Sequence, residues 1–183
     1  MRAFLAFEVA QPVVANLLMA EEDLRKTGAD IGIVGRENIH FTVRFFGDIP
    51  ETTTGEIDAM IGRVALESLD ITVRGIGVFP DPRRPRVVWA GVAPGDAAKM
   101  VRLSTSIIKA VEGVGTPDER PFHPHITLGR VRSPRNTEAL GSFVQQNQSR
   151  DFGRTKLDKL KLKSSVLTPM GAIYSDVREY ALN

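Results

Sequence analysis

The sequence predicts one domain of the α+β class. The chain has 183 residues, of which 42% are apolar and 25% are charged, so it can bury one core and has the composition of neither a disordered nor a membrane protein. Segments with the alternation of strands are interspersed with segments whose apolar residues recur at helical spacing. The order strand, helix, strand, helix, strand occurs once on each side of a loop at residues 80–86. We therefore expect a single domain over residues 1–183 with an internal duplication.

The first elements are predicted from one apolar run and one proline. Residues 2–9, RAFLAFEV, read as a buried strand. Pro12 suits the first turn of a helix, which we expect to continue to residue 26 and to end before Gly28.

The next strand and helix complete the first copy of the order. The pattern NIHFTVRFF predicts a strand over residues 38–46. Thr52 or Thr53 is a suitable N-cap for a helix after it. The apolar residues of this helix would be Ile57, Ile61, Val64 and Ala65. Strands are then expected at 71–79 and 87–92, on either side of the proline-containing loop.

The second half repeats these signals. A stripe of apolar residues predicts a helix over 96–112, which Gly113 would end. Further elements are expected as a strand at 122–131, a helix at 136–146 and two strands at 156–167 and 172–182. In the first of these last two strands lysine alternates with leucine, which is typical of the outer face of an edge strand.

A four-residue pattern of His, apolar, Thr, apolar occurs twice, as HFTV at 40–43 and HITL at 125–128. Both copies fall on predicted strands. Because strand side chains alternate, each His and Thr would share one face at a separation of roughly 6 to 7 Å, and the apolar residues would enter the core. Two such pairs are far less expected by chance than one, which favours a shared site over two solvated sheet faces.

Two His-Thr pairs that face each other across a cleft suit in-line attack at phosphorus. Imidazole titrates near neutrality, so one of His40 and His125 can be a neutral base while the other is a protonated acid. One would take a proton from the attacking water and the other would give one to the leaving oxygen. The hydroxyls of Thr42 and Thr127 can then donate hydrogen bonds to phosphate oxygens.

Two arginines are candidates for neutralising the phosphate. Arg44 has the same strand parity as His40 and Thr42, so it should point toward the cleft. Arg130 has the opposite parity to His125, and it would reach the phosphate if Gly129 introduces a β-bulge.

With these motifs the chain resembles the two-histidine phosphoesterases, specifically the RNA 2′,3′-cyclic phosphodiesterases, also called 2′-5′ RNA ligases. The resemblance runs nearly end to end. Besides the HFTV and HITL motifs it takes in RAFLAFEV, the Glu37-Asn38 pair and the terminal SSVLTPMGAIYSDVREYAL. Val43 stands where the family more often has Leu, and the IVGR segment before Glu37 matches less well.

The resemblance implies a bilobal fold in which two antiparallel sheets line a central cleft, with helices outside. It also implies hydrolysis of 2′,3′-cyclic phosphate RNA ends, such as those of tRNA fragments, to 2′-phosphates without a metal, and reversible 2′-5′ ligation. By analogy His40 would be the proton donor and His125 the proton acceptor, although these two roles could be exchanged. Thr42, Thr127 and Arg130 would hold the phosphate.

Other features of the sequence bear on binding. Three arginines in the 80–86 loop, Arg83, Arg84 and Arg86, could track an RNA backbone, and Trp89 after them could stack a base or belong to the core. His123 lies two residues before His125, but without a nearby carboxylate the pair is a poor metal site.

Absent features narrow the function. The chain has no cysteine, which excludes disulfides, thiol nucleophiles and thiolate zinc sites. No phosphate-binding glycine loop is present, so we expect no ATP and no other cofactor. The N-terminus lacks a signal peptide or membrane span, and a cytoplasmic monomer is therefore expected. The net charge of +2 does not itself indicate nucleic acid.

Two rival functions remain open at this level. One is a module that binds RNA or a nucleotide in the same cleft without turnover. The other is the same chemistry on a different substrate, such as 2′-5′ oligoadenylate or a cyclic phosphate of ADP-ribose. Binding that survives loss of either imidazole, with no turnover by the parent protein, would favour the first.

Overall fold

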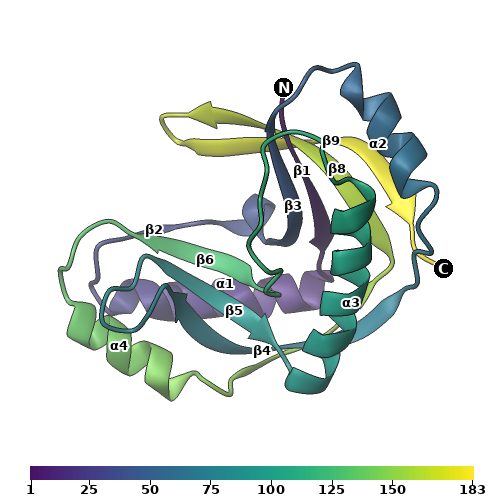
Figure 1. Cartoon of the computed structure of the whole chain (residues 1–183). Coiled ribbons are helices and arrows are strands. Elements are labelled where there is room, and N and C mark those ends of the chain that lie inside the picture. Colours follow the sequence, from purple (N-terminus) through teal and green to yellow (C-terminus); the bar gives the residue numbers. More distant parts are fainter.

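A computed structural model describes residues 1–183, which fold into strands with helices interspersed among them (Figure 1). The strands are β1 (Arg2–Glu8), β2 (Ile31–Ile33), β3 (His40–Asp48), β4 (Leu69–Phe79), β5 (Val87–Val92), β6 (Ile126–Val131), β7 (Asp151–Leu157), β8 (Lys159–Thr168) and β9 (Gly171–Ala181). The helices are α1 (Gln11–Lys26), α2 (Thr53–Ile61), α3 (Pro94–Ala110) and α4 (Thr137–Gln146), and η1 (Arg36–Asn38) is one 3₁₀ turn.

The expected antiparallel halves are present, and they are joined into one sheet. The strand order is β7-β4-β5-β6-β3-β1-β8-β9, with β2 paired to β6. The halves meet at β3 and β6, which share a single residue pair, Phe41 with Ile126. Since HFTV lies on β3 and HITL spans the start of β6, the junction of the sheet is built from the two motifs.

The internal duplication is confirmed by the element order. The units β1-α1-β3 and β5-α3-β6 are each followed by a helix, α2 or α4. Each copy then sends a strand across to the other half, because β4 pairs with β5 and β8 pairs with β1. The sheet halves therefore exchange strands, and neither half is a contiguous stretch of chain.

Helices cover the sheet on the side away from the gap between its halves. Helix α1 packs on β7 and α4 on β4, while α3 contacts both β3 and β4 (Figure 1). Leu17 and Leu24 of α1 are fully buried, in a cluster of 37 buried apolar residues. None of the helices has the length and apolar content needed to cross a bilayer.

Three of the expected element boundaries differ from the observed ones by more than two residues. The strand expected at 122–131 begins only at Ile126, because Pro124 has no N–H to donate to a ladder. Helix α2 ends at Ile61, which leaves Val64 outside it. The short strand β2 was not predicted, and the segment expected to start a strand at 156 contains the end of β7 as well as β8.

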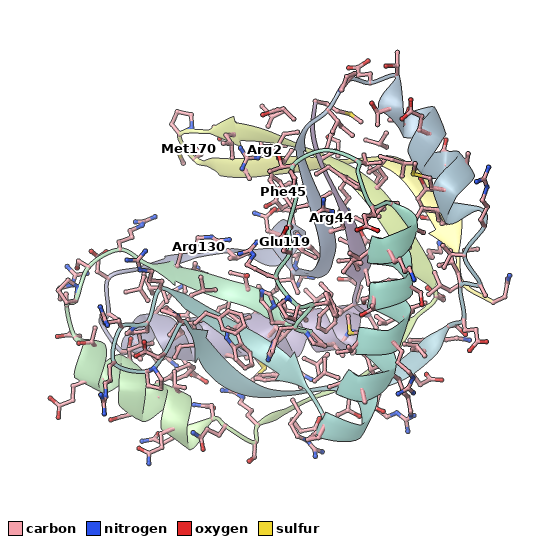
Figure 2. The ribbon with its side chains drawn as sticks, in the orientation of Figure 1. Arg2, Arg44, Phe45, Glu119, Arg130 and Met170 are labelled. Atoms are coloured by element: carbon pink, nitrogen blue, oxygen red, sulfur yellow. The ribbon has the colours of Figure 1, made fainter.

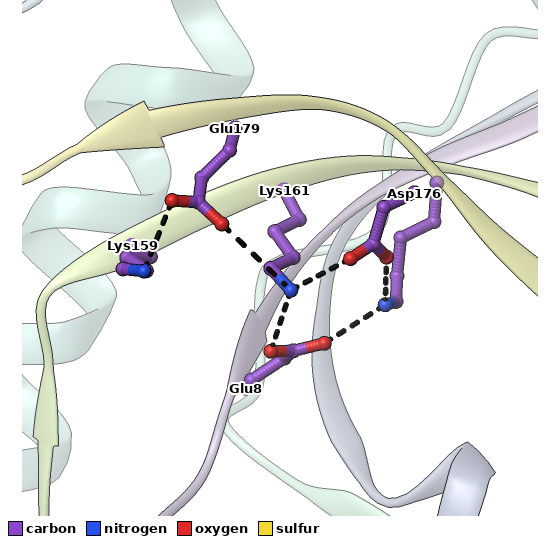
Figure 3. A network of polar contacts seen from close by, with 6 residues as sticks. Glu8, Lys159, Lys161, Asp176 and Glu179 are labelled. Carbon is purple, nitrogen blue, oxygen red and sulfur yellow. Dashed lines mark hydrogen bonds and ion pairs between the residues drawn. The ribbon is translucent and has the colours of Figure 1, made fainter.

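The lysine-rich run is not the outer face of an edge strand. Strand β8 lies between β1 and β9, and the side chains of Lys161 and Lys163 are only 13% and 8% exposed. Both ammonium groups contact Glu8 and Asp176, and together they form an ion-pair network across three strands (Figure 3). The alternation of lysine and leucine is present, but the charges of Lys161 and Lys163 are neutralised by carboxylates of the neighbouring strands.

Candidate active site

The two His-Thr motifs come together at the junction of the sheet. Phe41 and Ile126 are paired antiparallel and are both fully buried. This register places the residues that flank one of them next to those that flank the other, so His40 neighbours Thr127 and the residue before Ile126 neighbours Thr42. The side chains that flank Phe41 and Ile126 on the two strands therefore all point to the face of the sheet opposite the helices.

These side chains line one cleft of about 890 Å³. His40, Thr42, His125 and Thr127 all contribute to its wall. Three of them lie within strands as predicted, whereas His125 immediately precedes β6. The four residues inferred from the sequence pattern thus share one site.

His40 lies in an aromatic enclosure. Its ring stacks on Phe4 with centroids 5.1 Å apart, and Tyr174 approaches at 5.4 Å in an edge-on orientation. The buried Nδ1 atom has no hydrogen-bond partner. Burial, and to a smaller extent the charge of Lys163, lower the pKa of His40 to about 4, against an opposing effect of Glu8. Without ligand, His40 is therefore neutral near pH 7.

His125 is fixed by the chain next to it. Its Nδ1 lies 2.7 Å from the backbone carbonyl oxygen of His123. A carbonyl only accepts, so Nδ1 carries the hydrogen and Nε2 carries the lone pair in the neutral ring. Burial lowers the pKa of His125, and the hydrogen bond to the carbonyl of His123 opposes this shift. The geometry therefore presents a proton acceptor.

Arg130 reaches the cleft in the way proposed from the sequence. Opposite β5, Thr127 pairs with Trp89 and Gly129 pairs with Val88, so the ladder skips Leu128. This irregularity returns Arg130 to the row of Thr127. Arg130 is exposed and lines the cleft.

The alternation used to place Arg44 is broken. Two adjacent residues of β1 pair with Thr42 and Arg44, so Val43 has no partner on β1. This irregularity places the side chain of Arg44 on the other face of β3 from that of Thr42. Its side chain is buried at the wall of the cleft, where Nη2 donates to the carbonyl oxygen of Thr116 at 2.7 Å. Arg44 thus holds the loop after α3 in place through a hydrogen bond. A direct contact of Arg44 with phosphate remains a prediction.

A cation on the first-motif side comes instead from Arg2, which the sequence analysis missed. Phe45 is as far along the chain from His40 as Arg130 is from His125. It occupies the cleft face of β3. The guanidinium of Arg2 lies over the ring of Phe45, 4.9 Å from its centroid. Arg2 and Phe45 face Arg130 across the gap between the halves (Figure 2). Strand parity put Arg2 on the face of Phe4, but only the pairing of β1 with β3 identifies that face as the cleft.

The arginine loop lies beyond the rim. Asp81 organises it by accepting backbone hydrogen bonds from Arg83 and Arg84 at 2.9 and 3.2 Å. Arg83, Arg84 and Arg86 are all exposed. They do not line the cleft, although Phe79 and Val87, which flank the loop, do. A contact of this loop with bound RNA stays a prediction.

His123 belongs to an aromatic cluster. Its ring packs edge-on against Phe79 and Trp89, with centroids 5.2 and 5.3 Å apart, and lies 6.1 Å from the ring of His125. The structure has no group of three or more His, Cys, Asp or Glu side chains placed to hold a metal ion. His123 therefore acts on His125 through packing and through its backbone carbonyl.

The ion-pair network of Figure 3 allows a test of the environment of His40. Replacing Lys163 with glutamine removes a positive charge that opposes the imidazolium, so we expect the pKa of His40 to rise above about 4. Glu8→Gln removes a favourable charge, and the pKa should fall. Nuclear magnetic resonance titration of the ring protons measures both shifts.

Lys159→Gln is the matched control, because Lys159 lies on the same strand as Lys163 but pairs with Glu179 of β9 and does not contribute to the pKa shift of His40. Its titration should match that of the parent. Shifts of the same sign in the Lys163 and Glu8 variants would contradict the proposed electrostatics.

Comparison with known proteins extends the match beyond the motifs. A sequence profile of the 2′-5′ RNA ligase superfamily matches residues 20–164. The RNA 2′,3′-cyclic phosphodiesterase of Methanothermobacter thermautotrophicus is 34% identical over 183 residues, covering 99% of this chain and 98% of that protein. The protein of the same name from Aeropyrum pernix is 34% identical over 168 residues, 91% of this chain and 95% of the other.

Solved structures show the same fold. TT0787 of Thermus thermophilus superposes with a TM-score of 0.80 at 28% identity, and the match covers 100% of this chain and 98% of that one. LigT of E. coli in its apo form superposes with a TM-score of 0.76 at 21% identity, over 99% of this chain and 96% of that one. Because nearly the whole chain is covered, the similarity includes both halves of the sheet.

Proposed function

Because the chain belongs to the 2′-5′ RNA ligase superfamily, we propose that it opens 2′,3′-cyclic phosphates at RNA ends to leave 2′-phosphates. The observation that carries the proposal is the register of Phe41 with Ile126, which brings two His-Thr pairs into one cleft. The names of the curated relatives support the same reaction and the same substrate class.

His125 is the proton acceptor in this proposal. Its Nε2 takes a proton from water as the water oxygen attacks phosphorus, and the carbonyl of His123 stabilises the imidazolium that forms. The bond from phosphorus to O3′ breaks in the same displacement. His40 gives a proton to O3′, so the products are a 2′-phosphate and a 3′-hydroxyl. The two histidines then exchange a proton with solvent.

The donor role of His40 depends on bound substrate. A pKa of about 4 leaves little imidazolium near pH 7. An anionic cyclic phosphate next to the ring favours the protonated form and raises that pKa. The acid is thus generated where the phosphate is held, between the hydroxyls of Thr42 and Thr127 and the guanidinium of Arg130.

The residues of the cleft support catalysis without a metal. Asp118 is the only carboxylate that lines the cleft, and both of its oxygens accept hydrogen bonds from the guanidinium of Arg120 at 2.8 Å. An engaged carboxylate and separated imidazoles are poor ligands for a divalent cation. Charge at the phosphate would instead be neutralised by the exposed arginines.

The same arrangement supports reversible 2′-5′ ligation. If the 5′-hydroxyl of a second RNA replaces water, its proton goes to His125 and its oxygen forms the new bond to phosphorus. O3′ again leaves with a proton from His40, and the product is a 2′-5′ linkage. Reversal of these steps regenerates the cyclic phosphate.

The test is an incubation of the purified protein with a short RNA ending in 2′,3′-cyclic phosphate, in the presence of EDTA. We expect a 2′-phosphate product, identified by ³¹P nuclear magnetic resonance. A 3′-phosphate product would overturn the assigned leaving group, and activity abolished by EDTA would overturn the metal-independent mechanism. Binding without turnover would replace the proposal with a binding module.

A further inference from the structure

A second pocket of about 490 Å³ adjoins the active-site cleft. His123 lines both, so the two are neighbours. The chemistry described above does not use this pocket. Its other walls come from β4, β5, the first turn of α3 and the segment after α4, and include Arg74, Trp89, Ala97, Gln148 and Ser149.

The floor of the pocket is shaped by an indole ring. Gly77 opposes Trp89 across the β4-β5 ladder, and a Cβ atom at Gly77 would lie only 2.3 Å from that ring. A Cβ at Gly91 would lie 3.0 Å from it. The indole therefore fills the space above two glycines and extends across the sheet, where it offers an aromatic surface to the pocket.

The polar groups of the pocket suit an anion and a neutral heterocycle. No Asp or Glu lines it. Arg74 is its one full charge, and its side chain is 45% exposed with a single hydrogen bond, from Nη2 to Asp151 at 2.8 Å. The remaining guanidinium N–H groups can bind a phosphate. Gln148 and Ser149 add neutral donors and acceptors.

We propose that this pocket binds the nucleotide that precedes the cyclic-phosphate nucleotide of an RNA end, with its base on Trp89 and its phosphate near Arg74. This deepens the proposed function and rests on it. An aromatic surface beside a cation is the combination that binds single-stranded nucleic acid without regard to sequence. The position next to His123, whose carbonyl fixes His125, places this nucleotide directly beside the reacting phosphate.

The test compares substrates of one and two nucleotides. A mononucleoside 2′,3′-cyclic phosphate leaves the pocket empty, whereas a dinucleotide fills it. We expect the parent protein to prefer the dinucleotide in kcat/KM by roughly fivefold to a hundredfold, which is the range of one base stacked on an aromatic ring. Ala97→Leu fills the pocket from α3 and should abolish the preference while leaving mononucleotide turnover unchanged.

Ala98→Leu is the matched control, because Ala98 is exposed on the same helix and does not line the pocket. This variant should retain the preference. A parent protein that turns over both substrates equally would overturn the proposal. Equal losses on both substrates in the Ala97 variant would also overturn it, since the pocket would then serve the terminal nucleotide.

A binding measurement separates this proposal from the proposed function. Trp89 is the only tryptophan and lines the pocket, so an emission change beyond that caused by a mononucleoside 2′-phosphate reports on the pocket. A dinucleotide ending in 2′-phosphate should change the emission of the parent and of Ala98→Leu but not of Ala97→Leu. This result would support the pocket even if no turnover were found, and an unchanged emission in the parent would overturn it.

Discussion

Replacing either His40 or His125 with alanine is expected to lower kcat for opening a 2′,3′-cyclic phosphate by about a hundredfold to ten-thousandfold. Each variant removes one of the two proton transfers of a single displacement. The double variant should be little slower than either single one, because the two groups act as a unit. Single-turnover rates on a short RNA, measured in EDTA, give these ratios.

His123→Gln is the control for this prediction. Its ring packs against Phe79 and Trp89 but takes no part in proton transfer, and the carbonyl that holds His125 belongs to the backbone and is retained. We expect a much smaller loss. Thermal unfolding of all variants shows whether the fold is kept. Turnover that is indifferent to either His40 or His125 in a folded variant would remove both from the mechanism.

The main features of the site could be predicted because they depend on short sequence patterns. The repeat of His, apolar, Thr, apolar placed Phe41 and Ile126 in the core, and both are fully buried. The repeated element order predicted a duplication, which the strand exchange of β4 and β8 confirms. These signals are local, so no knowledge of strand pairing was needed to find them.

What the sequence did not show depends on pairing between distant strands. Alternation along β3 placed Arg44 beside Thr42, but the skipped Val43 reverses this, and only the register with β1 reveals it. At β6, Gly129 suggested a β-bulge from the sequence, and the pairing with β5 confirms it. Lys163 reads as a surface residue until β1 and β9 are seen to supply its carboxylates.

The same pairing argument assigns the phosphate cations. Arg130 lines the cleft, whereas the guanidinium of Arg44 donates to a backbone carbonyl. We therefore expect Arg130→Ala to lower kcat/KM by about a hundredfold, which is the effect of losing one hydrogen-bond donor to the charge that develops on the phosphate. Arg130→Lys should recover part of this, because an ammonium restores the charge without the two parallel hydrogen bonds. Arg2→Ala should cause a smaller loss, since Arg2 acts from the opposite wall.

Steady-state kinetics on a cyclic-phosphate RNA, together with unfolding temperatures, distinguish these roles from structural ones. Arg132→Ala is the matched control, because Arg132 is exposed near Arg130 on the chain but does not line the cleft. If Arg2 only supports the ring of Phe45, its loss should lower the unfolding temperature and leave kcat/KM unchanged. If Arg132→Ala loses as much activity as Arg130→Ala, the arginines contribute general attraction for RNA, and the phosphate must be held by the two threonines and the backbone.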